Sequence, residues 1–339
     1  MKSNRTNRRD FITKSTLAAT GLSLGINSLS AAGVMLPLNG LSNHNFENIL
    51  PAEPKRGMIC AFSKLFQFLD YNQLSEVFAA AGLDGIDLTV RPGGHVEPER
   101  VKTDLSKAVA AARKNGVEVY MMTSAITAAD NKLDQEVLKT AADLGVKYYR
   151  TGYLDYDYTK SIPENLDNAR KIFEKLAIFN EKTGIHGAYQ NHHQQPHIGS
   201  PVWDLWTILK NIDPEWISCQ YDIWHAVIEG YSSWSNGLRL LSPYIKTRCI
   251  KDFTWINQND KMIPEAVPLG KGQIDFDAYF KLLNELKLKG DTSLHIEYQV
   301  LSNEENNLPV KNKMEKALTI LKRDTDKLKS IMTKNNFKL

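Results

Sequence analysis

The stretch "DLSKAVAAARKNGVEVYMMTSA" (residues 104–125) predicts the repeating unit of the fold. Its first half carries apolar side chains at the spacing of one buried helix face, namely at Leu105, Ala108, Val109 and Ala112. Asn115-Gly116 then provides a helix stop signal. The apolar run at 117–125 indicates a buried strand. This stretch is therefore expected to form a helix that leads directly into a strand.

The same alternation of strand and helix extends along the rest of the chain. Strand-like runs are expected at 57–63, 85–90, 117–125, 147–153, 185–191, 217–222, 245–253 and 292–299. Eight strand–helix units in about 270 residues predict an α/β fold, a single (β/α)8 TIM barrel, which we place at 55–325. No G-x-G-x-x-G loop follows the first strand, which disfavours an open doubly wound sheet.

The N-terminal segment, residues 1–32, resembles a bacterial twin-arginine export signal. Arg8 and Arg9 precede Phe11 and a modest apolar run, which ends in small residues near Ala32. That run is too short and too polar for a stable membrane span, and a disordered basic tail is the alternative. We therefore expect an exported, periplasmic protein, with a linker at 33–54 and a C-terminal tail at 326–339.

Composition narrows the range of partners. The chain has 339 residues and a net charge of +3, and its acids and bases are interleaved, so no basic face for nucleic acid is expected. Cys60, Cys219 and Cys249 are an odd number of cysteines in apolar runs, which indicates buried thiols rather than a disulfide framework. The oligomeric state is not decided by the sequence, and a homodimer is left open.

Polar side chains gather where the predicted strands end, which is where such barrels carry their chemistry. They are Arg91, His95, Arg150, Gln190, Asn191, His192, His193, Asp222, Trp224, His225, Lys251 and Glu297. A buried carboxylate requires a partner or a metal, and a lysine there is a candidate acid, base or electrostatic stabiliser. Ion pairing of Lys251 with Asp222 or Asp252, and of Glu297 with Lys251 or Arg150, is the structural alternative.

Five segments in order resemble the xylose-isomerase-like barrels of the sugar (phosphate) isomerase/epimerase group. They are "AYQNHH" (188–193), "QYDIWHA" (220–226), "IKDF" (250–253), "VPLGKGQIDF" (267–276) and "LHIEY" (294–298), of which the fourth is the most specific. The resemblance implies a divalent metal, manganese first, with magnesium or zinc as alternatives. The implied ligands are Asp222 and Glu297, joined here by Gln190 and His192. Gln190 stands where the family usually has Glu, and Cys249 where it usually has His.

The resemblance also implies proton abstraction next to a sugar carbonyl, with the metal stabilising the enediolate. The expected catalytic residues are Glu297, Lys251, His225 and His192. The expected substrate-binding residues are His95, Arg91, Arg150, Asn191, His193 and Trp224. Export favours a free sugar or glycoside over a sugar phosphate. We therefore expect a metal-dependent sugar isomerase/epimerase. A keto-glycoside lyase or hydratase and a non-catalytic sugar-binding barrel are the alternatives.

Overall fold

The computed structural model describes residues 57–194 and 196–339. The predicted export signal (1–32) and linker (33–54) lie outside the described residues, as do the first two residues of the predicted barrel. Within the described part of the chain, no helix is long and apolar enough to cross a membrane.

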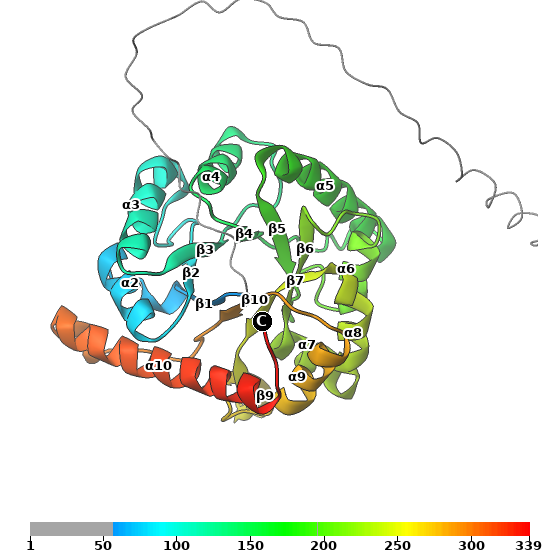
Figure 1. Ribbon diagram of the computed structural model, residues 1–339. Helices are drawn as coiled ribbons and strands as arrows, with labels where there is room; N and C mark the ends of the chain where they lie inside the picture. The colour runs from blue at the N-terminus through cyan, green and yellow to red at the C-terminus, as the bar shows by residue number, and fades with distance from the viewer. Residues whose placement is uncertain (1–56, 195) are drawn as a thin grey trace, which may run out of the picture. The chain divides into compact units, whose positions relative to one another are not determined.

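Eight parallel strands of the described chain form a closed barrel, and Figure 1 looks along it. The barrel closes because β1 pairs in parallel with β10, in addition to its pairing with β2. The strands are β1 (Ile59–Phe62), β2 (Gly85–Thr89), β3 (Glu118–Thr123), β4 (Tyr148–Arg150), β5 (His186–Gln190), β6 (Ile217–Asp222), β7 (Ile245–Ile250) and β10 (Asp291–Leu294). The predicted (β/α)8 barrel is confirmed.

Helices surround the strands on the outside of the barrel (Figure 1). The predicted apolar stripe of α3 is buried, as amphipathic helix packing requires. The helices are α2 (Tyr71–Ala80), α3 (Val101–Lys114), α4 (Lys132–Asp143), α5 (Ile162–Thr183), α6 (Val202–Leu209), α7 (Ile223–Gly230), α8 (Trp234–Leu241), α9 (Phe276–Glu285) and α10 (Val310–Lys334). Short 3-10 turns are η1 (Lys64–Phe66), η2 (Pro98–Arg100), η3 (Tyr231–Ser233), η4 (Ser242–Tyr244) and η5 (Glu305–Asn307).

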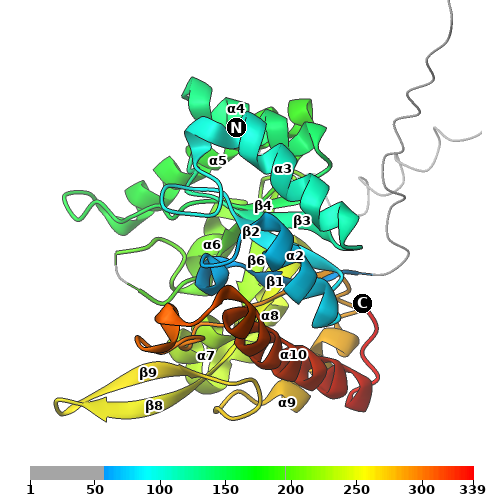
Figure 2. The ribbon, with the colours of Figure 1, turned by 90° about the vertical axis from the view of Figure 1, so that its left-hand side faces the viewer.

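A β-hairpin follows β7 and projects from the body of the barrel (Figure 2). It consists of the antiparallel strands β8 (Asp252–Gln258) and β9 (Lys261–Val267). The sequence prediction merged the start of β8 into the seventh strand and missed the hairpin. Its signal was the turn at Asn259 and Asp260, where both φ angles are positive (52° and 59°), as a two-residue hairpin turn requires.

The segment 326–339, set apart as a C-terminal tail in the sequence prediction, continues the last helix and packs beyond residue 325. Helix α10 continues to Lys334, and Leu328 and Ile331 are buried. Phe337 is buried as well, with its ring centroid 5.0 Å from that of Phe280. The apolar spacing of a buried helix face therefore continues past the predicted boundary.

The segment "VPLGKGQIDF" wraps around one carboxylate. Asp252 accepts backbone N–H groups from Gly270 and Gly272 at 2.9 Å each, and from Ile274 at 3.3 Å. A Cβ atom on Gly272 would lie 2.2 Å from Asp252 Oδ1 and 2.3 Å from the carbonyl oxygen of Phe253. Glycine is therefore required there, and Asp252 anchors this loop beside the end of β7.

Candidate active site

Three charged side chains meet at the carboxyl ends of adjacent strands. The ammonium nitrogen of Lys251, just after β7, lies 3.0 Å from Asp222 Oδ2 at the end of β6. It also lies 3.9 Å from Glu297 Oε1, which follows β10. Asp222 and Lys251 are buried, and the ammonium lies 4.8 Å from the centre of a Trp224 ring. The expected ion pairs of Lys251 with Asp222 and Glu297 are present, whereas Asp252 holds the loop described above.

This arrangement keeps both Lys251 and Glu297 charged. Burial opposes the charge of Lys251, but the carboxylates of Asp222 and Glu297 outweigh it, and the pKa of Lys251 lies above its ordinary value. Burial also opposes the charge of Glu297. There the interactions with His295, Lys251 and Lys64 prevail, and the pKa of Glu297 lies below its ordinary value. An ammonium and a carboxylate therefore face each other at neutral pH.

The amide of Gln190 links a cation to a carboxylate. Its Oε1 accepts hydrogen bonds from the Arg150 guanidinium and, at 2.6 Å, from the Tyr153 hydroxyl. Its Nε2 donates to Asp222 Oδ2 at 2.7 Å. The orientation follows from the neighbours, because a guanidinium only donates and a carboxylate only accepts. Both ends of the amide are therefore used within the protein.

Asn191 fixes the backbone of Asp222. Its Nδ2 donates to the Asp222 carbonyl oxygen at 3.0 Å, and its Oδ1 accepts the Asp222 N–H at 2.8 Å. Asn191 is buried. The structure therefore places this predicted substrate-binding residue behind Asp222, where its contacts hold the end of β6 in position.

His225 continues the row of polar groups away from Lys251. Asp222 caps α7 by accepting the His225 backbone N–H at 3.3 Å. The pKa of the His225 imidazole is held well below its ordinary value by burial and by Lys251, so the ring is neutral. Since an ammonium only donates, His225 Nε2 accepts from Lys251 at 2.9 Å and Nδ1 donates to His193 Nδ1 at 2.5 Å. Lys251, His225 and His193 thus form a hydrogen-bonded row.

His192 packs on this row through its ring. The ring centroid lies 4.1 Å from that of His225 and 4.9 Å from that of Tyr153. Its Nδ1 accepts the backbone N–H of Gln194 at 3.4 Å. Burial and the nearby Lys251 charge lower the pKa of His192 to about 2. His192 is therefore a neutral aromatic contact beside His225.

Two predicted substrate-binding residues, Arg91 after β2 and Arg150 at the end of β4, both lie over the ring of Phe62. The guanidinium groups of Arg91 and Arg150 lie 5.8 Å and 5.7 Å from the centre of its ring. His95 is tied to the same end of the barrel, with Nδ1 3.0 Å from Thr89 Oγ1. Burial lowers the pKa of His95 to about 4, so it is neutral at pH 7.

Sequence reasoning did not select His295 as a site residue. Its ring stacks on Phe62 with centroids 4.5 Å apart. Its Nδ1 lies 3.6 Å from Glu297 Oε1, and its Nε2 lies 3.8 Å from Asp87 Oδ2. Asp87, also missed, accepts a hydrogen bond from Ser293 at 2.7 Å. The available signal was the two-residue spacing from Glu297, which places both side chains on one face of the strand expected at 292–299, although β10 itself ends at Leu294.

Lys64 is a further residue that the sequence prediction missed. Its ammonium nitrogen lies 3.1 Å from Glu297 Oε2, and the side chains of Lys64 and Glu297 are 44% and 19% exposed. Lys64 is thus an outer cation, and Lys251 an inner one, on either side of the Glu297 carboxylate. Position 64 follows β1, which pairs with β10, so only the closure of the barrel brings Lys64 near Glu297.

The residues predicted to bind a metal do not fit a divalent ion in this arrangement. Asp222 is engaged by Lys251 and Gln190, and the Gln190 oxygen is held by Arg150. Over the described residues, no group of three or more His, Cys, Asp or Glu side chains is placed to hold a metal ion.

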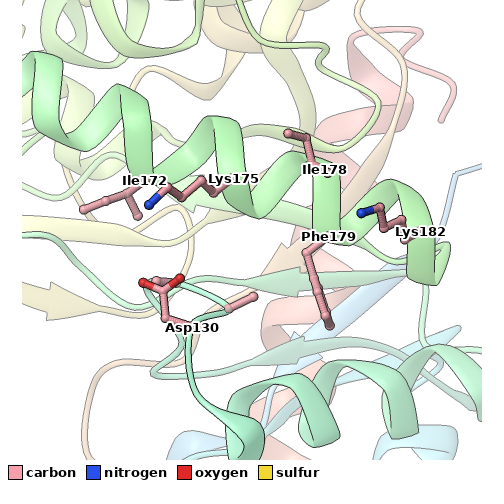
Figure 3. Close-up of a pocket in the computed structure, with 8 residues that line it drawn as sticks. Asp130, Ile172, Lys175, Ile178, Phe179 and Lys182 are labelled. Carbon is pink, nitrogen blue, oxygen red and sulfur yellow. The ribbon is translucent and has the colours of Figure 1, made fainter.

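A separate hollow lies in the outer layer, between α5 and the loop after β3 (Figure 3). It is lined by Ala128, Ala129, Asp130, Ile172, Lys175, Ile178, Phe179 and Lys182. This lining includes none of the predicted site residues and no histidine. We therefore assign the chemistry to the strand ends.

Solved structures of sugar epimerases share this fold. The D-psicose 3-epimerase of Clostridium cellulolyticum H10, determined with D-tagatose, has a TM-score of 0.60 at 13% identity and covers 81% of this chain and 99% of its own. An L-ribulose 3-epimerase gives 0.61 at 14% identity, with 83% and 96% covered. The 3-keto-D-glucoside 4-epimerase of E. coli, in its apo form, gives 0.55 at 15% identity, with 78% and 99% covered. At such identities the likeness establishes the fold alone.

Sequence comparison identifies the family. No match to a curated protein sequence was found. The family model described as "Xylose isomerase-like TIM barrel" matches residues 76–323, which include α3, the hairpin and all the site residues from Arg91 to Glu297. The chain therefore belongs to the xylose isomerase-like TIM barrel family.

Proposed function

We propose that this protein is a sugar isomerase/epimerase that moves a proton at the carbon next to a sugar carbonyl. The observation that carries the proposal is the pairing of the Glu297 carboxylate with the Lys251 ammonium, 3.9 Å apart at the carboxyl ends of the barrel strands. Proton abstraction next to a carbonyl needs a base and a positive group that stabilises the developing oxyanion. The sugar epimerases among the structural neighbours support the same reaction class.

Glu297 is the base in this proposal. Its side chain is 19% exposed, so it is more accessible than Asp222, and its depressed pKa keeps it ionised at neutral pH. The carboxylate takes the proton from carbon, and the electron pair of the C–H bond moves onto the carbonyl oxygen. Lys251 stabilises the resulting enediolate oxygen by charge and hydrogen bonding. Return of a proton to the same carbon on the other face gives an epimer, and return to the neighbouring carbon gives an isomer.

The histidines and arginines near the strand ends orient the sugar. Burial and Lys251 keep both His225 and His192 neutral. His225 uses both ring nitrogens on Lys251 and His193 and therefore positions these two groups. His192 accepts at Nδ1 from Gln194, so its Nε2 can donate to a sugar hydroxyl. Trp224 offers an apolar ring to the C–H face of a sugar. Arg91, His95, Arg150 and His193 complete the proposed binding set. Asn191 acts indirectly by holding Asp222. The export signal expected from the sequence supports a periplasmic location and an unphosphorylated sugar or glycoside as the substrate.

A keto-glycoside lyase or hydratase is the second candidate, and Gln190 favours it. Inverting a carbon centre calls for a proton donor on the face opposite the base. The amide at position 190 has no titratable proton and is bonded to Arg150 and Asp222. Elimination from the same enolate forms a C=C bond as the C–O bond at the β carbon breaks, and the proton taken up by Glu297 can pass to the leaving oxygen, so no donor on the opposite face is needed. The fold shared with a 3-keto-D-glucoside 4-epimerase makes keto-glucosides a reasonable substrate class for both candidates.

Product analysis separates the candidates. The protein is incubated with ketohexoses and with 3-keto-glucosides, and the products are identified by NMR. A changed stereocentre means epimerase, a moved carbonyl means isomerase, and a released aglycone means lyase. The Glu297→Gln variant is the matched control. Saturable sugar binding without any conversion would instead support a non-catalytic sugar-binding barrel and contradict the proposal.

A further inference from the structure

The acidic groups of the site are already balanced by side-chain cations. The buried Asp222 carboxylate contacts the Lys251 ammonium at 3.0 Å and accepts from Gln190 at 2.7 Å. Glu297 contacts Lys64 at 3.1 Å and lies 3.9 Å from Lys251. A buried carboxylate requires a positive partner or hydrogen bonds. Here the protein supplies both from its own residues.

Gln190 contributes to this charge balance because its side chain is a neutral amide. A carboxylate in the same place would put a second acidic oxygen at the 2.7 Å contact with Asp222, and a further cation would be needed between them. The amide instead gives its N–H to Asp222 and its oxygen to Arg150. A negative charge at position 190 is therefore replaced by a neutral bridge.

Lys251 occupies the place where an ion joining the two carboxylates would lie. Its nitrogen is within 4 Å of oxygens from both Asp222 and Glu297. A divalent ion would have to displace this ammonium or bind beside it, where like charges repel. The ammonium is held from other directions by His225 Nε2 at 2.9 Å and by the Trp224 ring, whose face attracts cations.

We propose that Lys251 is a built-in cation that takes the place of a divalent metal in this barrel and binds the carbonyl and hydroxyl oxygens of the substrate directly. The replacement of the metal follows from the contacts above and holds whatever the substrate is. The role toward substrate oxygens rests on the proposed function. The two parts are therefore tested separately.

The first experiment measures metal binding without substrate. Purified protein is equilibrated with manganese, magnesium or zinc, desalted and analysed for metal, and its melting temperature is recorded with each ion and with EDTA. We expect much less than one metal per chain and the same melting temperature in every condition. One tightly held metal per chain, or a melting temperature lowered by EDTA, would overturn the proposal.

The second experiment converts the built-in cation into a metal site. The double variant Lys251→Met with Gln190→Glu removes the ammonium and adds a carboxylate beside Asp222. We expect manganese at saturation to raise its melting temperature by about 5 °C or more, with no shift for the wild type. Lys246→Met is the matched control, because Lys246 lies in β7, the strand that leads to Lys251, but pairs with Glu215 at the protein surface.

Lys251→Arg provides a second test of metal binding if the double variant does not fold. This variant retains the positive charge, so we expect it to bind no metal, as the wild type does. Equal manganese affinities of the wild type, Lys251→Arg and Lys246→Met at one site per chain would contradict the built-in cation. Because these readouts need no substrate, failure of the proposed reaction would leave them intact.

Discussion

The Lys251 ammonium lies 3.0 Å from a carboxylate oxygen of Asp222, and both side chains are buried at the carboxyl end of the barrel. Neither charged group is exposed to bulk water, so each charge is stabilised by the other. Gln190 and His225 provide the remaining hydrogen bonds of the pair. The pair therefore links the stability of the barrel to the electrostatics of its proposed active site.

Asp222→Asn should destabilise the protein strongly. The substitution keeps the size of the side chain but leaves the Lys251 ammonium buried without its main counter-charge, which typically costs about 3–5 kcal/mol. Urea unfolding at pH 7 measures the loss. The double variant with Lys251→Met should recover much of it, because the uncompensated charge is then gone. Additive losses in the two single variants would mean that the two groups are not coupled.

Glu297→Gln should remove activity while leaving the fold intact. Loss of a positioned general base typically lowers the rate about 10²- to 10⁴-fold. Steady-state kinetics on the substrate found by product analysis gives the effect, and circular dichroism checks the fold. Lys64→Met is a useful comparison, since its exposed pair with Glu297 should contribute only about 0–1 kcal/mol to stability. Full activity of Glu297→Gln would exclude it as the base.

Asn191→Ala should lower the free energy of unfolding by about 1–3 kcal/mol for each buried backbone group that loses its partner. The Nδ2 and Oδ1 atoms of the Asn191 side chain both form hydrogen bonds with the Asp222 backbone. We expect the turnover number to fall more than the Michaelis constant rises, because the position of Asp222 changes while the binding groups stay. A large rise in the Michaelis constant with unchanged stability would instead indicate direct contact with the substrate.

Acidification below pH 6.5 should destabilise the protein through its buried histidines. Burial lowers the pKa of His95 to about 4 and, with smaller contributions from Lys246 and Lys147, that of His186 to about 3. The unfolded chain takes up protons below the ordinary histidine pKa of about 6.5, and the native state does not. Stability is therefore full above that pH and is lost as the pH falls, by about 1.4 kcal/mol per pH unit for each such histidine.

Urea unfolding between pH 7.5 and pH 5 measures this slope. His186→Gln offers a test away from the proposed active site, because His186 bonds Ser218 at 2.8 Å inside the barrel. The variant should show a slope smaller by about one proton. An unfolding free energy that does not change over this range would mean that these imidazoles titrate normally in the native state.

The spacing of apolar residues and the order of the apolar runs along the chain predicted most of the fold. The stripe at Leu105 and Ala108 and the strand that follows it repeat around the barrel, and each apolar run marks a strand. The errors lie where local signals are weak. The turn at Asn259 and Asp260 was not recognised as a hairpin turn.

The sequence indicated that the candidate residues lie near one end of the barrel, but it did not indicate which of them contact one another. Alternation along the strands placed Gln190, Asp222 and Glu297 at one end of the barrel, and the structure brings the first two into contact. Which group satisfies which charge depends on side-chain directions across strands, and a one-dimensional pattern does not contain them. The approach of Lys64 to Glu297 and the orientation of the Gln190 amide are of this kind.

Exchange of a substrate proton with solvent deuterium tests the central claim most directly. The protein is incubated with a converted keto-sugar or keto-glucoside in heavy water, and deuterium is located by NMR. The account predicts deuterium at the carbon next to the carbonyl with the wild type, and its loss with Glu297→Gln. Conversion of the substrate with no deuterium at that carbon, or unchanged incorporation by the variant, would contradict proton abstraction by Glu297.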